Sequence, residues 1–409
     1  MKMDWRQLFA SLRQRPNLPG LLLSTVALGL AFSFVSPFLS MWGTTEVGLS
    51  PFQFGLFMTV VASCSMVLST VLARLSDTRL SRRTVLLLGS ASGALGFTGY
   101  ALLRDPLLLL LVGGTCVAVA SVCFSQLFAH VRETFGHARV PRAEAGFIMS
   151  IVRIGFSVAW TFGPAVGAVM MTQLGFVGLF LTAATLYLVF HLGVWRFVPT
   201  HQRPRPLVRP NTPSVWRVHT RRDLLLSFLA FVLVFAATAM NALTLPLLVT
   251  QVLGGSGRDL GITFGIGPLV EIPLMLWFGQ LAARGHQERL LYLGAAITAV
   301  YYFGLSFVQE PWQVFPLQVL SGASFAILTN VAILYFQDLV PGQTGLATNM
   351  FSNASNLGNL GGFFAFGALL QHTGHRGVVL VCALLAASML GLLFTSHTLR
   401  DRLAKSEPS

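Results

Sequence analysis

Charged residues are scarce in this chain. They make up 10% of its 409 residues, whereas hydrophobic residues make up 54%. A water-soluble domain of this length needs more charge than that to cover its surface. The scarcity excludes an ordinary soluble protein, and the mean hydropathy of +0.71 indicates a chain that lies mostly in lipid.

Signals for covalent frameworks and for catalysis are also lacking. The cysteines all lie in apolar runs without paired spacing, which argues against disulfides and a zinc site: Cys64, Cys116, Cys123 and Cys382. The apolar runs hold no His-Glu-x-x-His, no Gly-x-Ser-x-Gly and no carboxylate pair, and the chain has no Walker A sequence. We therefore expect no metal, no cofactor and no enzymatic activity. The first apolar run is too long for the core of a cleaved signal peptide.

Long apolar runs are what the chain does have. Crossing the hydrocarbon core takes about 20 apolar residues, and runs of this kind are too long and continuous for barrel strands. They predict twelve transmembrane helices, near 18–42, 52–73, 84–103, 107–130, 145–171, 174–197, 224–250, 259–282, 290–308, 312–336, 346–370 and 377–396. The predicted fold class is an all-α polytopic membrane protein.

The basic residues predict the orientation. With the N-terminus in the cytoplasm, 23 of the 27 Lys and Arg residues fall in cytoplasmic segments. Three, Arg104, Arg258 and Arg376, fall in outer loops, and Arg153 lies inside a span. This is the bias of the positive-inside rule, so both termini are expected in the cytoplasm. It also accounts for the net charge of +13 without nucleic acid.

A long connection rich in Pro and Arg divides the spans into six and six. We expect an N-terminal half at 1–198, a cytoplasmic linker at 199–223, a C-terminal half at 224–398 and a cytoplasmic tail at 399–409. Prolines prevent the linker from continuing either helix.

The two halves repeat each other at an offset of 206 residues. LARLSDTRLSRR at 72–83 aligns with FGQLAARGHQER at 278–289, with Ala283 opposite Asp77. An acidic residue among arginines at a helix–helix turn can form an ion-pair latch that holds one conformation closed; alternatively, the arginines only set topology. The expected latch residues are Asp77, Arg82, Arg83, Arg132 and Glu133.

A duplicated six-helix unit with this turn resembles the major facilitator superfamily, whose signature is Gly-x-Leu-x-Asp-Arg-x-Gly-Arg-Arg. The resemblance implies two pseudo-symmetric halves that rock about a site at the midplane. In the fifth span, Gly155, Gly163, Pro164 and Gly167 resemble the Gly-Pro-x-x-Gly signature of export-type members, although helix packing explains them equally well.

Further strings resemble the sugar efflux transporter family within that superfamily. They are EVGLSPFQFGLF, QLFAHVRE, VEIP, LYFQDLVPG and GLATNMFSNASNLG, spread over both halves in order. The resemblance implies a proton-linked exporter of mono- or disaccharides or glycoside analogues, in a bacterial inner membrane. In the seventh span the chain departs from the family: Thr238, Asn241 and Thr244 stand where the family tends to carry Asn, Tyr and Asp.

Two charged residues lie deep in spans, and such residues are functional candidates because a charge in hydrocarbon is costly. Glu271 in the eighth span lies near mid-bilayer, where it is a candidate proton-coupling group. Arg153 in the fifth offers a rigid fork of donors to a substrate. Alternatively, the two residues form a structural ion pair.

Sugar recognition needs hydrogen-bonding groups and aromatic faces in a cavity. The superfamily fold places helices 1, 4, 7 and 10 around that cavity, aided by 5, 8 and 11. The expected substrate contacts are Gln126, Arg153, Trp160, Asn241, Thr244, Asn330, Asn353 and Asn356, with Asn359 a weaker candidate one turn beyond.

Three functions remain open from these residues. A secondary exporter of sugars, working as a monomer with a small solute, protons and membrane lipid as its partners, fits the amides in helices 4, 10 and 11. An exporter of amphipathic drugs would use the same scaffold with an apolar cavity. A receptor or scaffold is the third reading, for which the six-plus-six repeat has no evident purpose.

Overall fold

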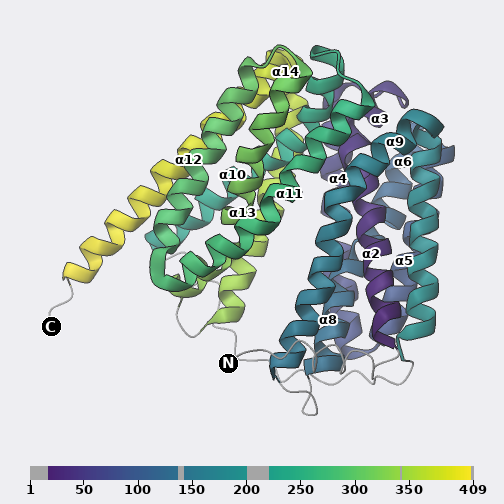
Figure 1. Cartoon of the computed structure of the whole chain (residues 1–409), viewed down its shortest axis with the longest axis horizontal. Coiled ribbons are helices and arrows are strands. Elements are labelled where there is room, and N and C mark those ends of the chain that lie inside the picture. Colours follow the sequence, from purple (N-terminus) through teal and green to yellow (C-terminus); the bar gives the residue numbers. More distant parts are fainter. Residues whose placement is uncertain (1–16, 137–141, 200–220, 341–342, 407–409) are drawn as a thin grey trace. The chain divides into compact units, whose positions relative to one another are not determined.

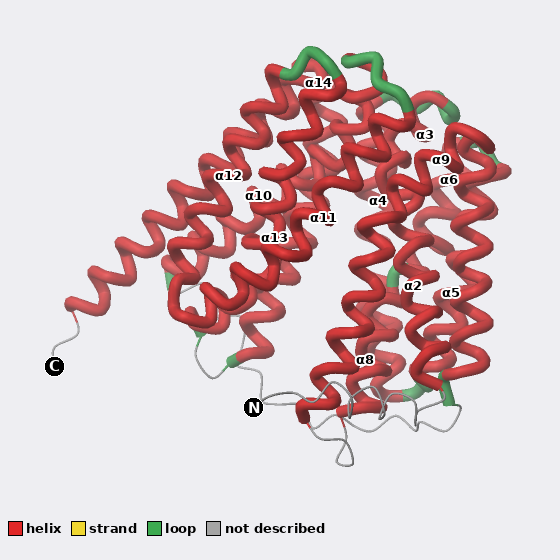
Figure 2. The backbone as a smooth tube through the Cα atoms, in the orientation of Figure 1, coloured by secondary structure: helices red, strands yellow, loops and turns green. Residues whose placement is uncertain are grey.

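The computed structural model describes residues 17–136, 142–199, 221–340 and 343–406. Every regular element in these ranges is a helix (Figure 2). The expected linker at 199–223 lies outside the described residues except at its two ends.

Ten helices of the described chain are long and apolar enough to cross a membrane. Two of them are interrupted by a glycine: α9 (Arg142–Phe197) at Gly175 with φ of 65°, and α14 (Thr344–Ser406) at Gly374 with φ of 67°. Positive φ is open to glycine without a steric penalty, so the chain leaves the helix there and starts a new one. Dividing α9 and α14 at these residues gives twelve helical segments, which is consistent with the twelve predicted spans.

The described residues form two compact units. Unit 1 holds the described parts of 1–36 and 60–207, and unit 2 those of 37–59 and 208–409. The tip of the first helical hairpin therefore belongs with unit 2, although it precedes the expected linker.

Unit 1 is a bundle in which α2 and α5 pack against α9 (Figure 1). Its helices are α2 (Asn17–Val35), the rest of α4 (Pro51–Thr78), α5 (Arg82–Leu102), α6 (Pro106–Val112), η2 (Gly113–Val117), α7 (Ala118–Ala120), α8 (Val122–Gly136) and α9. Small residues let α2 approach α9 closely. A Cβ on Gly29 would lie 2.7 Å from that of Ala159, and the Ser33 hydroxyl donates to the Ala159 carbonyl at 3.0 Å.

Unit 2 has α10 packed along α14 and α13 packed on α11 and α12. Its helices are α3 (Leu39–Thr45), the start of α4, α10 (Arg222–Leu247), η4 (Leu248–Val252), α11 (Gly257–Leu281), η5 (Ala282–His286), α12 (Gln287–Phe307), η6 (Pro311–Gln313), α13 (Val314–Leu339) and α14, with η1 (Ser36–Phe38) entering it. The start of α4 lies against α14 with backbone in contact with backbone. A Cβ on Gly55 would lie 2.8 Å from the Gly367 Cα.

Capping residues mark several helix starts. The Ser81 hydroxyl accepts from the Thr84 amide at the start of α5, and Asp105 precedes Pro106 at the start of α6. Side chains of this kind satisfy amides that have no partner within the helix. The Ser81 cap sets the position of Arg82 in the first turn of α5.

Candidate functional site

Arg82 is the centre of a polar cluster in unit 1. Its Nε and Nη2 donate to the two carboxylate oxygens of Glu133 on α8, both at 2.6 Å. Nη2 also pairs with Asp77 on α4 at 2.9 Å. The Arg82 side chain is only 11% exposed, so the paired guanidinium ties together the ends of α4, α5 and α8. We name Ser76, Asp77, Arg82, Gln126 and Glu133 the Arg82 cluster.

Gln126 belongs to this cluster. Its side-chain oxygen accepts from Arg82 Nη1 at 2.8 Å and from the Ser76 hydroxyl at 2.9 Å. The residue is buried. The structure thus places this expected substrate contact beside the expected latch residues.

Arg83 has a different contact. Its Nη2 donates to the Trp195 carbonyl in the last turn of α9 at 2.7 Å. Arg82 thus makes ion pairs to α4 and α8, and Arg83 ties α5 to α9. The side chain of Arg132 lies outside the described residues.

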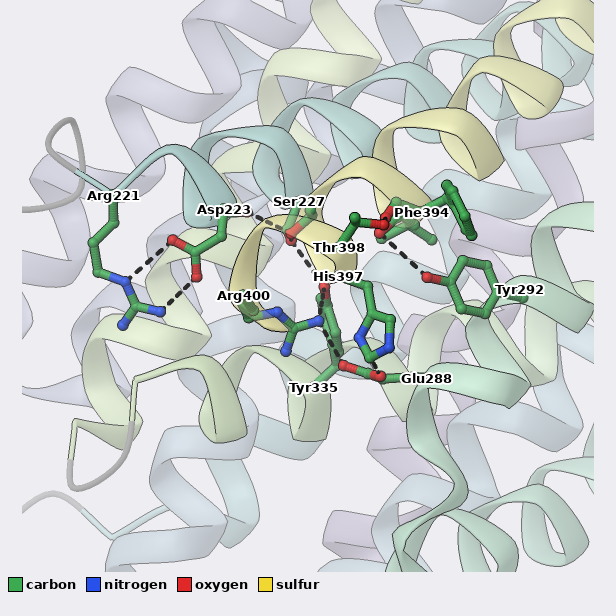
Figure 3. A network of polar contacts seen from close by, with 12 residues as sticks. Arg221, Asp223, Ser227, Glu288, Tyr292, Tyr335, Phe394, His397, Thr398 and Arg400 are labelled. Carbon is green, nitrogen blue, oxygen red and sulfur yellow. Dashed lines mark hydrogen bonds and ion pairs between the residues drawn. The ribbon is translucent and has the colours of Figure 1, made fainter. Parts of the chain in front are cut away.

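Glu288 is the centre of a second cluster, in unit 2 (Figure 3). It lies in the first turn of α12, and its two oxygens bind two side chains from the last part of α14. Arg400 Nη2 approaches Oε1 at 2.5 Å, and His397 Nδ1 approaches Oε2 at 2.9 Å. Arg400 also lies over the ring of Tyr335 on α13, 5.5 Å from its centroid.

Hydroxyl groups extend this second cluster to α10. The Ser227 hydroxyl lies 2.8 Å from that of Tyr335 and 2.9 Å from that of Ser396. Ser396 in turn donates to the Asp223 carbonyl at 2.8 Å, and the Asp223 carboxylate pairs with Arg221. We name Glu288, His397, Arg400, Tyr335, Ser227, Ser396 and Asp223 the Glu288 cluster. It joins one end of four helices.

A polar face lies exposed on α14. Asn349, Ser352, Asn353 and Asn356 follow helical spacing along it, and all four are exposed. Asn359, one turn further, is half-buried. Asn353 and Asn356, two of the expected substrate contacts, thus share one face.

Asn241 lies instead inside unit 2. Its Nδ2 donates to the Tyr301 hydroxyl at 3.4 Å. The same hydroxyl also accepts a hydrogen bond from Gln318 Nε2 at 3.2 Å. Its Oδ1 is buried and has no hydrogen-bond partner within the described residues. The neighbouring Thr244 is buried and donates to the Met240 carbonyl.

Trp160 ends a row of aromatic rings between α8 and α9. Phe124 lies 4.7 Å from both Phe128 and Phe156, and Phe156 lies 6.4 Å from Trp160, centroid to centroid. The Trp160 Nε1 has no hydrogen-bond partner among the described residues. Glu271 is half-buried on α11. The side chains of Arg153 and Asn330 lie outside the described residues.

Comparisons with known proteins agree with this architecture. The family model of the Major Facilitator Superfamily matches residues 21–360 and 228–408. Sugar efflux transporter A of Dickeya chrysanthemi is 32% identical over 88% of this chain and 91% of its own. The chain belongs to the sugar efflux transporter family of this superfamily.

More distant relatives are consistent with that family. Sugar efflux transporter C of Escherichia coli is 29% identical over 90% of this chain and 92% of its own. Multidrug resistance protein MdtG of Enterobacter lignolyticus is 25% identical over 93% of this chain and 91% of its own. The crystal structure of the nucleoside transporter NupG shares the fold, with a TM-score of 0.74 over 94% of this chain and 98% of that one at 14% identity. The transporter is thus a multi-pass membrane protein and not an enzyme.

Sequence reasoning missed the Glu288 cluster of this transporter. The 206-residue offset that pairs Arg83 with Arg289 also pairs Arg82 with Glu288. The turn is thus repeated with its central charge inverted: an arginine held by carboxylates in unit 1, and a glutamate held by an arginine and a histidine in unit 2. The sequence did not indicate this inversion, because the partners of Glu288 come from α14, more than 100 positions away.

Proposed function

We propose that this transporter exports sugars or glycoside-like solutes across a bacterial inner membrane, in exchange for protons and by alternating access. The sugar substrate is supported by the names of relatives that align over most of the chain. Both termini lie in the cytoplasm in this proposal, as the distribution of arginines predicts.

The exposed polar face of α14 is the observation that best supports a hydrophilic substrate. Asn353 and Asn356 lie within a membrane-spanning helix. An amide in hydrocarbon without a partner is costly, so exposed amides in a span face water or a polar ligand rather than lipid. Amides both donate and accept hydrogen bonds, which suits the hydroxyl groups of a sugar.

Glu271 is the proposed proton-coupling group. It is the acidic residue placed deepest in a predicted span, and it is half-buried on α11 between Pro268 and Pro273. The proposed set of substrate contacts is completed by Gln126, Arg153, Trp160, Asn241, Thr244 and Asn330. The aromatic row that ends at Trp160 offers ring faces to the C–H surface of a sugar.

The Arg82 cluster is the proposed conformational latch. Three helix ends meet in it, and its ion pairs are well formed in this arrangement. Ion pairs of this kind stabilise one of two conformations, and the protein can adopt the other conformation when the ion pairs break.

Uptake of radiolabelled lactose and glucose into proteoliposomes under an imposed pH gradient tests the proposal. We expect saturable, gradient-driven uptake by the parent and its loss in Glu271→Gln, which cannot carry a proton. Glu310→Gln is the matched control, because Glu310 is an exposed carboxylate in the α12–η6 connection.

The remaining outcomes discriminate between roles. Gradient-driven uptake that survives Glu271→Gln makes Glu271 structural. If no sugar moves while a cationic amphipathic drug does, the sugar assignment fails, and the relative MdtG and the aromatic row would then support drug export.

A further inference from the structure

The Glu288 cluster pairs a histidine with a carboxylate. His397 Nδ1 lies 2.9 Å from Glu288 Oε2, with the His397 side chain 39% exposed and that of Glu288 34% exposed. Histidine side chains commonly titrate between about pH 5 and 8. Because both side chains reach solvent, protons can exchange with the bulk at this position.

Several charged and titratable groups face His397 or its partner. Arg400 from α14 takes the other oxygen of Glu288 and lies near the Tyr335 hydroxyl of α13. Asp223 and Arg221 from α10 pair with each other, and Asp223 reaches the cluster through Ser396. Glu288 on α12 is thus the carboxylate that Arg400 and His397 share.

The equivalent position in the first half lacks this arrangement. An offset of 206 pairs His397 with His191, whose Nδ1 lies 2.8 Å from the neutral Ser90 hydroxyl. Protonating His191 gains no ion pair from that partner, whereas protonating His397 does. The two histidines thus stand at equivalent positions of the repeat, and His397 is the one that faces a carboxylate.

We propose that His397 makes the transporter respond to cytoplasmic pH, a role that rests on the proposed function and orientation. When His397 is protonated, it and Arg400 hold one oxygen of Glu288 each, and the end of α14 is clamped to α12. Through Tyr335, Ser227 and Ser396 the clamp reaches α13 and α10. Acid in the cytoplasm strengthens this tie and slows the transport cycle.

The neutral form holds α14 less firmly. A neutral imidazole loses the Coulomb attraction to the Glu288 carboxylate. Repulsion between protonated His397 and Arg400 reduces the gain, and so does solvent around partly exposed charges. Exposed ion pairs of this kind change an equilibrium by about two- to fivefold, which is the size of a regulatory adjustment.

Lactose counterflow at equal pH on both membrane faces tests the proposal without a proton gradient. We expect the exchange rate of the parent to rise about two- to fivefold from pH 6.0 to 7.5. His397→Gln and Glu288→Gln should flatten this dependence, and His397→Arg should give a slow rate at both pH values. His191→Gln, the matched control, should keep the dependence of the parent.

Thermal unfolding of the purified protein gives a readout that does not need transport. Lowering the pH from 7.5 to 6.0 should raise the unfolding temperature of the parent relative to that of His397→Gln by about 1–3 °C, and His191→Gln should follow the parent. The proposed role of His397 would be overturned if the difference in unfolding temperature between the parent and His397→Gln did not depend on pH. It would also be overturned if His397→Gln kept the counterflow profile of the parent. If the thermal effect is present but no sugar moves, the proposed sugar transport fails and the proton-sensitive clamp stands.

Discussion

Asparagine occupies two different environments in unit 2. The side chain of Asn241 is buried, where its amide donates to Tyr301 and its oxygen has no hydrogen-bond partner among the described residues. Asn353 and Asn356 are exposed on α14. An exposed amide can exchange water for a solute at little cost, whereas a buried one must first lose its packing. We therefore assign direct substrate contact to Asn353 before Asn241.

Replacing Asn353 by alanine should weaken sugar binding. Removing a hydrogen-bonding amide that meets a substrate hydroxyl costs about 0.5–1.5 kcal/mol, which raises KM by about two- to tenfold. Initial rates of lactose uptake across a concentration series measure this change. Asn359→Ala, on the next turn and half-buried, is the control and should leave KM within about twofold. An equal KM in both variants would remove Asn353 from the substrate site.

Helix ends are held together by single charged side chains in both units. Arg82 joins α5 to α4 and α8, and Glu288 joins α12 to α14. In each case the side chain lies in the first turn of its helix and reaches sideways to its neighbours. Because the bidentate pair of Arg82 with Glu133 fixes both distance and direction, it sets how the ends of α5 and α8 are spaced.

Arg82→Gln should destabilise unit 1. The change leaves the carboxylates of Asp77 and Glu133 facing each other without the guanidinium. Discounted for the exposure of these carboxylates, which is 35% and 38%, the cost is about 1–2 kcal/mol. The unfolding temperature of the purified protein measures it, with a fall of about 2–6 °C expected. An unchanged unfolding temperature in Arg82→Gln would contradict the assignment of Arg82 as the centre of the cluster.

At the scale of the whole molecule, two related bundles carry opposite central charges at equivalent turns. An offset of 206 residues relates the two turns, and each has a paired charge at the equivalent position. The first half uses an arginine surrounded by acids from nearby helices. The second uses a glutamate surrounded by bases from the last helix.

The orientation of the molecule is open to a direct measurement. Because most arginines fall in segments assigned to the cytoplasm, a fluorescent protein fused after Ser409 should fluoresce in cells, and alkaline phosphatase fused there should be inactive. Fusions after Arg104, in an assigned outer loop, should give the opposite result and serve as the control. Active phosphatase at the C-terminus would invert the topology and place both clusters on the outer face.

The sequence predicted the spans closely. The breaks within α9 and α14 fall at Gly175 and Gly374, next to the boundaries expected from hydropathy. Asp77, Arg82 and Glu133 were expected in one latch, and the structure brings these side chains together. Gln126 was expected at the substrate and lies in the same cluster, because the rotation of α8 turns it toward α5.

The sequence alone predicts the membrane spans and the family to which the chain belongs. The repeated turn is the sequence feature that indicates two halves. Hydropathy and glycine breaks are properties of short segments, so they need no knowledge of the fold. Only the tertiary structure decided which charges meet, since Glu288 and Arg400 are 112 positions apart and Ser227 and Ser396 are 169 apart. It also decided which asparagines are exposed, because that depends on how each helix is rotated against its neighbours.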